Sequence, residues 1–236
     1  NEMNLLYRNN LHQVKTDIFV PGGGRPQTLN ENNYTDFLDK EGLPTSRAIV
    51  EGANLYLTPK AREKLEKLGV VIIKDSSANK GGVISSSMEV LIGLTIDEAT
   101  FIEHKETIMK EVLAIIKEKA ELESKLILQT HEETKEPCTV ISEEVSSKIN
   151  RYTYEILEHL ESQTLPTDPK DPLNIALLNF YPPFISNSYQ ENVLTKLPDM
   201  HKKAIIASFL ASRVVYKRCF NALKWAVADI IRWSWG

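Results

Sequence analysis

The feature that most constrains the fold of this 236-residue chain is an alternation of short β-branched runs with helical stretches, from Asp17 to about Leu94. The runs Asp17–Val20, Arg47–Glu51 and Val70–Lys74 predict three strands, and the second and third are apolar enough for burial on both faces. Such alternation is typical of βα units, whose successive strands lie parallel in one sheet. The first part of the chain is therefore predicted to have an α/β fold.

The segment between the second and third runs has the signals of a helix with defined ends. Thr58 is suited to the N-cap, and Pro59 fits the first helical position because its missing N–H would lack an intrahelical partner there. Leu65 belongs to an apolar face with helical spacing, and Gly69 can end the helix. A β-α-β unit is the firmest structural prediction that the sequence supports, and a further helix is expected to begin near Val83.

After Leu94 the strand-like runs largely disappear and a 3.6-residue apolar periodicity takes over. Thr95 and Glu98 have the spacing of a capping box, which predicts Thr95 as the N-cap of the next helix. Additional helices are predicted around residues 145–160 and 198–218. The proline-rich stretch from Leu165 to Pro183 predicts a connector that contains at most one short helix.

Composition excludes several classes of function. Lys plus Arg total 28 against 32 Asp plus Glu, so no general cationic field would attract nucleic acid, and we expect no nucleic-acid partner. The apolar tail Phe220–Gly236 is interrupted by charges and too short to span a bilayer, so we expect no membrane partner. Two cysteines predict no disulfide framework and an intracellular, reducing compartment, cytoplasmic or mitochondrial. The opening at Asn1 lacks the pattern of a signal peptide, and we expect the natural start to be missing.

Two turns carry the residues best suited to bind a ligand. Glu51–Asn54 and Asn79–Ser86 each follow a predicted strand, and the carboxyl ends of parallel strands meet at the edge where open α/β folds bind nucleotides and substrates. Asn54 and Asn79 each offer amide donors and an acceptor, which suit a ribose hydroxyl or a carboxamide. Asparagine in a loop is also a common turn former, and that interpretation stays open.

Glycines and serines next to these turns extend the prediction. Gly81 and Gly82 would allow close approach, and Ser85–Ser87 lie where a helix start favours an anion such as a carboxylate; simple N-capping by a serine is the alternative. The turn Pro21–Pro26 could expose backbone N–H groups, but it lacks the third glycine and the immediate helix of a dinucleotide fingerprint. A tight turn that merely needs glycine explains it equally well.

Taken in order, these motifs resemble the cofactor domain of glutamate dehydrogenases. The large-subunit NAD-specific class is the most similar, because Gly23–Pro26 reads Gly-Gly-Arg-Pro after the first strand and Asn79–Gly82 reads Asn-Lys-Gly-Gly. The ordered motifs cover Asp17 to Leu94, and Ala207–Tyr216 resembles the C-terminal helix of that class. The resemblance implies an α/β fold, with a partial Rossmann-like, mostly parallel sheet in residues 1–95 and an all-helical C-terminal region in residues 96–236.

The resemblance also assigns roles at the cofactor. It implies that NAD is the cofactor, that Gly22 and Gly23 line it through their backbone, that Asn54 meets the nicotinamide-side ribose and that Asn79 meets the nicotinamide carboxamide. It further implies that Val83 and Ser86 contact the substrate pair, L-glutamate and 2-oxoglutarate, with Ser86 at the side-chain carboxylate.

The catalytic lysine and aspartate of that class match no residue of this chain, nor does its phosphate-binding glycine loop, so the sequence assigns no catalytic residue and no metal ligand. We expect these parts from the missing N-terminal portion of the same enzyme, which would be a homo-oligomer when complete. The chain alone should oxidise no glutamate. Two alternatives stay open: a non-catalytic nucleotide-binding or regulatory module, and a helical interaction protein whose function lies in residues 95–236.

Overall fold

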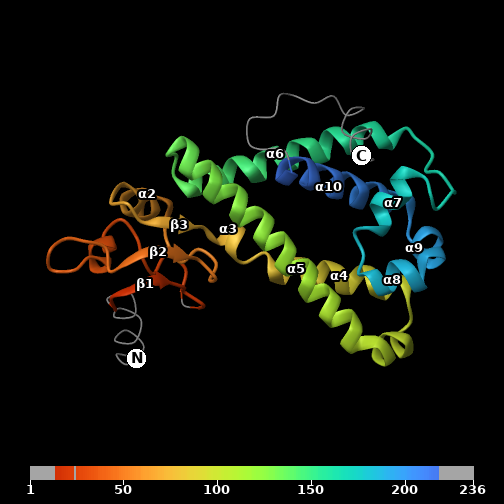
Figure 1. The fold of residues 1–236 in the computed structure, drawn as a ribbon, viewed down its shortest axis with the longest axis horizontal. Coiled ribbons are helices and arrows are strands. Elements are labelled where there is room, and N and C mark those ends of the chain that lie inside the picture. Colours follow the sequence, from red (N-terminus) through yellow and green to blue (C-terminus); the bar gives the residue numbers. More distant parts are fainter. Residues whose placement is uncertain (1–13, 24, 218–236) are drawn as a thin grey trace. The chain divides into compact units, whose positions relative to one another are not determined.

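A computed structural model describes residues 14–23 and 25–217 of the chain. Its three strands, β1 (Thr16–Phe19), β2 (Ser46–Val50) and β3 (Val71–Ile73), form one sheet in the order β1-β2-β3 (Figure 1). Both neighbouring pairs are parallel, with Ile49 opposite Ile72 in the β2–β3 register. The predicted α/β fold class and parallel sheet are confirmed.

The connection from β1 to β2 contains a short 3₁₀ helix, η2 (Tyr34–Phe37), and no α-helix. Asparagine side chains in this connection bond to nearby backbone groups: the Asn33 amide donates to the carbonyl of Thr28 and its oxygen accepts from the N–H of Asn30. Such local bonds compete with helix formation. The first crossover is therefore an ordered loop that is shaped by its own side chains.

The connection from β2 to β3 has the predicted helix, α2 (Pro59–Lys67). The Thr58 hydroxyl accepts a hydrogen bond from the N–H of Ala61 at 3.2 Å, which confirms Thr58 as the N-cap. Gly69 follows the helix at φ +86°, a left-handed conformation that glycine adopts without steric cost. Local sequence signals determine this β-α-β unit from end to end.

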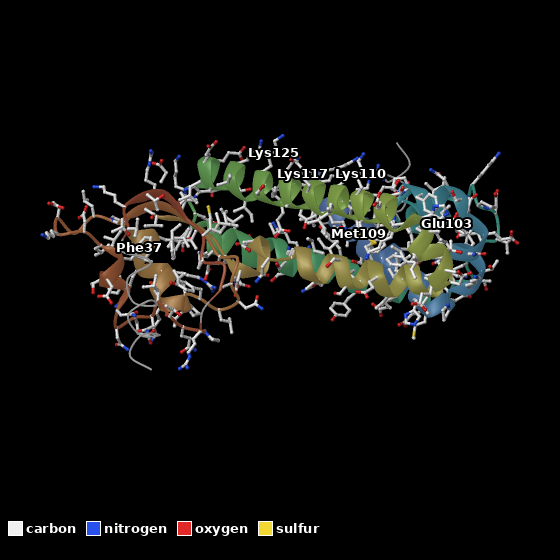
Figure 2. All side chains as sticks on the ribbon, turned by 90° about the horizontal axis from the view of Figure 1, so that it is seen from below. Phe37, Glu103, Met109, Lys110, Lys117 and Lys125 are labelled. Carbon is white, nitrogen blue, oxygen red and sulfur yellow. The ribbon has the colours of Figure 1, made fainter. Side chains whose placement is uncertain are left out.

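A cluster of buried apolar side chains lies between the sheet, α2 and the β1–β2 connection. Phe37 of η2 is buried within it (Figure 2), so the irregular crossover still contributes to the core. Burial of apolar area is the main stabilising contribution in such a unit. The fully or almost fully buried members are Leu29, Phe37, Ile49, Tyr56, Leu57, Leu65, Val70 and Ile72.

The remainder of the described chain is helical. In order, the helices are α3 (Asp75–Ala78), α4 (Gly81–Thr95), α5 (Glu98–Thr134), α6 (Cys138–Glu161), α7 (Pro172–Leu178), α8 (Pro183–Ser188), α9 (Gln190–Lys196) and α10 (Asp199–Lys217). The prolines of the predicted connector precede or begin the short helices α7 and α8, and Asp171 caps α7 through the N–H of Leu173. None of the described helices has the length and apolar character needed to cross a bilayer.

The chain forms two compact units. The sheet unit comprises the described residues up to Lys80 together with Ile127–Glu143, and the helical unit comprises Gly81–Leu126 together with the described residues from Glu144 onward. The sequence placed the division between residues 95 and 96, where the composition changes, and that domain division stays a prediction. In this structure α4 belongs to the helical unit.

One local prediction in the helical unit is wrong, the N-cap at Thr95. Thr95 is the last residue of α4, and its hydroxyl donates to the carbonyl of Leu91; the N–H of Thr100 bonds instead to the carboxylate of Asp97 at 2.8 Å. Asp97 therefore takes the capping role predicted for Thr95, because α4 extends to the position that the capping box would occupy. The predicted C-terminal helix is observed as α10 up to Lys217, and the tail Phe220–Gly236 lies outside the described residues.

Candidate site at the carboxyl edge of the sheet

The loops that follow β1 and β2 contact each other at the carboxyl edge of the sheet. The N–H of Ala53 donates to the carbonyl of Pro21 at 2.7 Å, and a Cβ on Gly52 would lie 3.2 Å from that same oxygen. Because a Cβ at this distance is tighter than an ordinary contact, a side chain at residue 52 would push the two loops apart. The glycine of the Glu51–Asn54 turn is therefore required by the close approach of its neighbouring loop.

The two asparagines singled out from the sequence are in direct contact. The Asn79 side-chain amide, after α3, donates a hydrogen bond to the side-chain oxygen of Asn54, after β2. This confirms the prediction that the two turns converge at one edge. An amide offers two N–H donors and a two-lone-pair acceptor, so one mutual bond leaves the pair able to donate to and accept from a ligand.

Behind this amide pair lies a buried ion network that the sequence analysis missed. Arg62 of α2 donates from Nε to Glu51 Oε2 at 2.7 Å and from one terminal nitrogen to Asp75 Oδ1 at 3.2 Å. Glu51 is fully buried, and Arg62 and Asp75 are nearly so. Burial raises the pKa of the Glu51 carboxyl, whereas the Arg62 guanidinium and the N–H of Leu57 favour the charged form.

The network fixes the backbone next to Asn54. Glu51 Oε1 accepts from the N–H of Leu57 at 3.0 Å, and Asp75 Oδ2 accepts from the N–H of Leu55 at 2.8 Å. Leu55, the neighbour of Asn54, is held at φ +55°, a left-handed conformation that costs a non-glycine residue roughly 1–2 kcal/mol. The carboxylates thus hold a strained turn in the conformation that presents Asn54.

Charged residues at otherwise apolar positions are the sequence signal that could have predicted this network. Arg62 lies beside Ala61 among the buried residues of α2. Glu51 comes directly after an apolar strand, where a side chain faces the interior. A cation and an anion that both interrupt apolar positions of consecutive elements indicate a buried pair.

Gly22 and Gly23 lie exposed in the loop after β1. A Cβ at either position would have no neighbouring atom within 4 Å, and neither residue has the positive φ that favours glycine. In this structure neither crowding nor backbone conformation requires glycine there. Close approach of a ligand to the backbone is a remaining reason for glycine at these positions.

The two residues assigned to the substrate lie on α4 in the helical unit. Val83 is 69% exposed, and Ser86 is exposed with its hydroxyl donating to the carbonyl of Val83 at 3.1 Å. Because α4 begins at Gly81, the serines of the Asn79–Ser86 motif lie within the helix and none of them is the N-cap. The alternative interpretation, N-capping by one of these serines, is wrong. The described residues contain no cluster of three or more His, Cys, Asp or Glu side chains able to hold a metal ion.

Comparison with protein families finds a match that covers this edge of the sheet. Residues 1–136 match the profile of the family described as Glutamate/Leucine/Phenylalanine/Valine dehydrogenase. The matched range includes both asparagine turns, the ion network behind them and the start of α4. No solved structure gives a significant match to the chain.

Similarity to individual glutamate dehydrogenases extends over almost the whole of this chain. It is 35% identical over 238 residues to the "Probable NAD-specific glutamate dehydrogenase" of Schizosaccharomyces pombe, covering 96% of this chain and 21% of that protein. It is 36% identical over 239 residues to "Glutamate dehydrogenase 2" of Dictyostelium discoideum (95% and 23%), and 35% identical over 240 residues to the "NAD-specific glutamate dehydrogenase" of Neurospora crassa (95% and 22%). The chain therefore spans about a fifth of the length of these relatives. Since the profile matches more than half of the chain, the chain belongs to the glutamate/leucine/phenylalanine/valine dehydrogenase family.

Proposed function

We propose that the chain is the C-terminal part of an NAD-dependent glutamate dehydrogenase, which converts L-glutamate, NAD and water to 2-oxoglutarate, ammonia and NADH. The observation that carries the proposal is the Asn54–Asn79 amide pair, which is held by a buried ion network at the carboxyl edge of a parallel sheet in a chain of this family. The names of the relatives, which specify NAD and glutamate, support the choice of cofactor and substrate.

The donor set at the sheet edge fits the nicotinamide end of NAD. A carboxamide presents one donor group and one acceptor, which the free donors and acceptors of Asn79 would match, and Asn54 would hold a ribose hydroxyl. Gly22 and Gly23, which have open space around them, would let the cofactor approach the backbone. When bound, NAD accepts the hydride from the substrate, and these residues orient it for that transfer.

The first turns of α4 fit an anionic substrate. The unpaired N–H groups of a helix N-terminus and the helix dipole both favour a carboxylate. Ser86 lies in the second turn, and its hydroxyl can rotate away from the Val83 carbonyl and donate to a carboxylate instead. In this proposal Ser86 holds the side-chain carboxylate of glutamate, and Val83 offers apolar contact to the carbon chain.

The chain supplies orientation without the proton-transfer groups. The residues that remove protons from glutamate would come from an N-terminal portion of the same polypeptide, and the complete enzyme would assemble as a homo-oligomer. We therefore expect the isolated 236-residue chain to form no NADH from glutamate and NAD. NADH formation by the purified chain would show that it contains an unrecognised general base.

The cofactor assignment is tested in the full-length enzyme with Asn79→Leu, which keeps the side-chain size and removes the amide. Steady-state kinetics should show KM for NAD raised about 10- to 100-fold, because the carboxamide would be left without its partners. KM for glutamate should change much less. Asn32→Leu, at an exposed loop position of the same unit, is the matched control and should leave both values unchanged.

Unchanged kinetics for Asn79→Leu would contradict the cofactor assignment and would favour the interpretation of the chain as a helical interaction protein.

The substrate assignment is tested separately with Ser86→Ala, for which we expect KM for glutamate to rise about tenfold while KM for NAD stays the same. Ser87→Ala, one position further along α4 and equally exposed, is its control. Equal effects of the two serine variants would remove Ser86 from the site.

A further inference from the structure

The helical unit contains a cavity of about 340 Å³ between α5, the C-terminal end of α7 and α10. Its size lies at the lower end of the range for small-molecule sites. All of its lining residues belong to the helical unit, and none of them belongs to the residues assigned above to NAD or glutamate. The cavity is therefore separate from the proposed nicotinamide site.

The wall of the cavity carries an excess of positive charge. Lys119 of α5 and Arg213 and Lys217 of α10 line it, against a single acidic residue, Glu118. Within the part of the chain that the structure describes, no ion pair joins Lys119 or Arg213 to a carboxylate. An anion in the cavity would meet at least two cationic side chains that are not already neutralised.

Lys119 is the most informative of these cations. It is half-buried, and its Nζ lies 4.8 Å from the centroid of the Phe180 ring, over the ring face. Burial lowers the pKa of Lys119, and only Glu118 acts in the opposite direction. A partly buried cation that forms no ion pair is costly in the free protein, and an anionic ligand would relieve that cost.

The cavity wall also offers aromatic surface. Phe180, Phe209 and Tyr216 line it, and the Tyr216 hydroxyl points its hydrogen to Glu123 at 2.7 Å. With that hydroxyl engaged, Tyr216 presents mainly its ring to the cavity. Aromatic rings together with cations suit a ligand that combines a planar apolar body with a negatively charged group.

From this combination of cavity, unpaired cations and rings, we propose that the helical unit binds a small organic anion, in which a phosphate or carboxylate meets Lys119 and Arg213 and an aromatic body packs against Phe180 and Phe209. The site is a second ligand site of the protein. It does not depend on the proposed function, because it lies in the helical unit and uses none of the asparagine turns.

The test measures binding of phenyl phosphate to the full-length protein by isothermal titration calorimetry. Methyl phosphate, which lacks the ring, and benzyl alcohol, which lacks the charge, are the comparison ligands, and each should bind at least about tenfold more weakly. Benzoate distinguishes the two candidate headgroups, since the preferred one will bind more tightly to the same residues.

The variants Lys119→Gln and Arg213→Gln, combined, should weaken phenyl phosphate binding about tenfold or more. The charge-matched control combines Lys110→Gln and Lys125→Gln, two exposed lysines that lie along α5 (Figure 2), and should leave binding unchanged. Asn79→Leu should also leave it unchanged, which separates this site from the proposed cofactor site.

A second readout protects the test against unfolding of the double variant. Lys119→Met removes the withdrawn charge and keeps the length of the side chain, so hydrogen exchange of α5 and α10 in the ligand-free protein should slow, while phenyl phosphate binding becomes weaker. No saturable binding to the unaltered protein would overturn the proposal. Equal weakening by the control pair, or binding of methyl phosphate as tight as that of phenyl phosphate, would overturn it as well.

Discussion

The two units bury their polar groups in different ways. In the sheet unit, Glu51, Arg62 and Asp75 are withdrawn from water together and pair with one another and with backbone N–H groups. In the helical unit, α10 presents an apolar face that includes Ile206 and Leu210, and Asn192 and Lys196 bond to the carbonyl at the end of α4. Its buried carboxylate, Glu123, is bonded by the neutral hydroxyl of Tyr216.

The difference follows from what each unit must hold in place. A helix is positioned by its apolar face alone, because its backbone groups are already bonded within the helix. A loop at a sheet edge lacks the regular backbone hydrogen bonds of a helix, so here buried carboxylates that accept its N–H groups help to position it, together with buried Tyr56 and Leu57. The sheet unit therefore depends on charge at its centre, and the helical unit can leave cations such as Lys119 at a cavity wall.

The largest expected loss of stability follows from a substitution in the buried ion network of the sheet unit. Arg62→Met would leave Glu51 and Asp75 buried without a counter-charge and should destabilise the sheet unit locally by about 3–5 kcal/mol. Hydrogen exchange of peptides that contain β2 and β3, measured on the full-length protein, reports this change. Arg151→Met removes a half-exposed cation of the helical unit that pairs with Glu155, and should change local stability by less than about 1 kcal/mol.

The same variant should be pH-dependent with a defined sign. Burial already raises the pKa of Glu51, and loss of the guanidinium would raise it further, so the folded variant keeps a proton that the unfolded chain releases. The destabilisation should therefore be larger at about pH 8 than at about pH 5. Equal losses for Arg62→Met and Arg151→Met, independent of pH, would show that the two units do not differ in this way.

A smaller effect is expected from the most buried polar contact between α5 and α10. Tyr216→Phe removes a 2.7 Å hydrogen bond to the carboxylate of Glu123, which is 3% exposed, and should destabilise the helical unit by about 1.5–3 kcal/mol. Burial, with Glu123 in addition, raises the pKa of Tyr216, so the hydroxyl stays a donor over the usual pH range. Tyr154→Phe, at a 73% exposed position on α6, should have no measurable effect in the same exchange experiment.

Local signals account for the parts of the fold that the sequence predicted. The cap at Thr58, the proline at the first helical position and Gly69 at the helix end all act within a few residues, and α2 follows them closely. The convergence of Asn54 and Asn79 was equally predictable, because parallel strands bring their carboxyl ends to one edge.

The parts that were missed depend on contacts distant in sequence or on competition between neighbours. The Arg62–Asp75 pair joins residues 13 apart in two elements, and no local pattern records which anion a buried arginine will meet. The predicted N-cap at Thr95 was wrong because α4 extends through Thr95. Asp97 then caps the next helix through the N–H of Thr100. In the β1–β2 connection, where no particular helix was predicted, asparagine side chains bond to nearby backbone groups and the chain forms a 3₁₀ helix.

The smallest expected effect compares one substitution at two glycines, one in each unit. Gly69→Ala places a Cβ at φ +86°, where the cost is conformational because no atom lies within 4 Å, and should destabilise the end of α2 by roughly 1–2 kcal/mol. Gly93→Ala, in the last turn of α4 and equally uncrowded, should stabilise that helix by up to roughly 0.5–1 kcal/mol, because alanine loses less backbone entropy. Hydrogen exchange of residues 58–73 and 81–95 should then change in opposite directions. A change of the same sign at both glycines would mean that the left-handed turn after α2 is absent from the protein in solution, and with it the tight connection that sets the length of the crossover to β3.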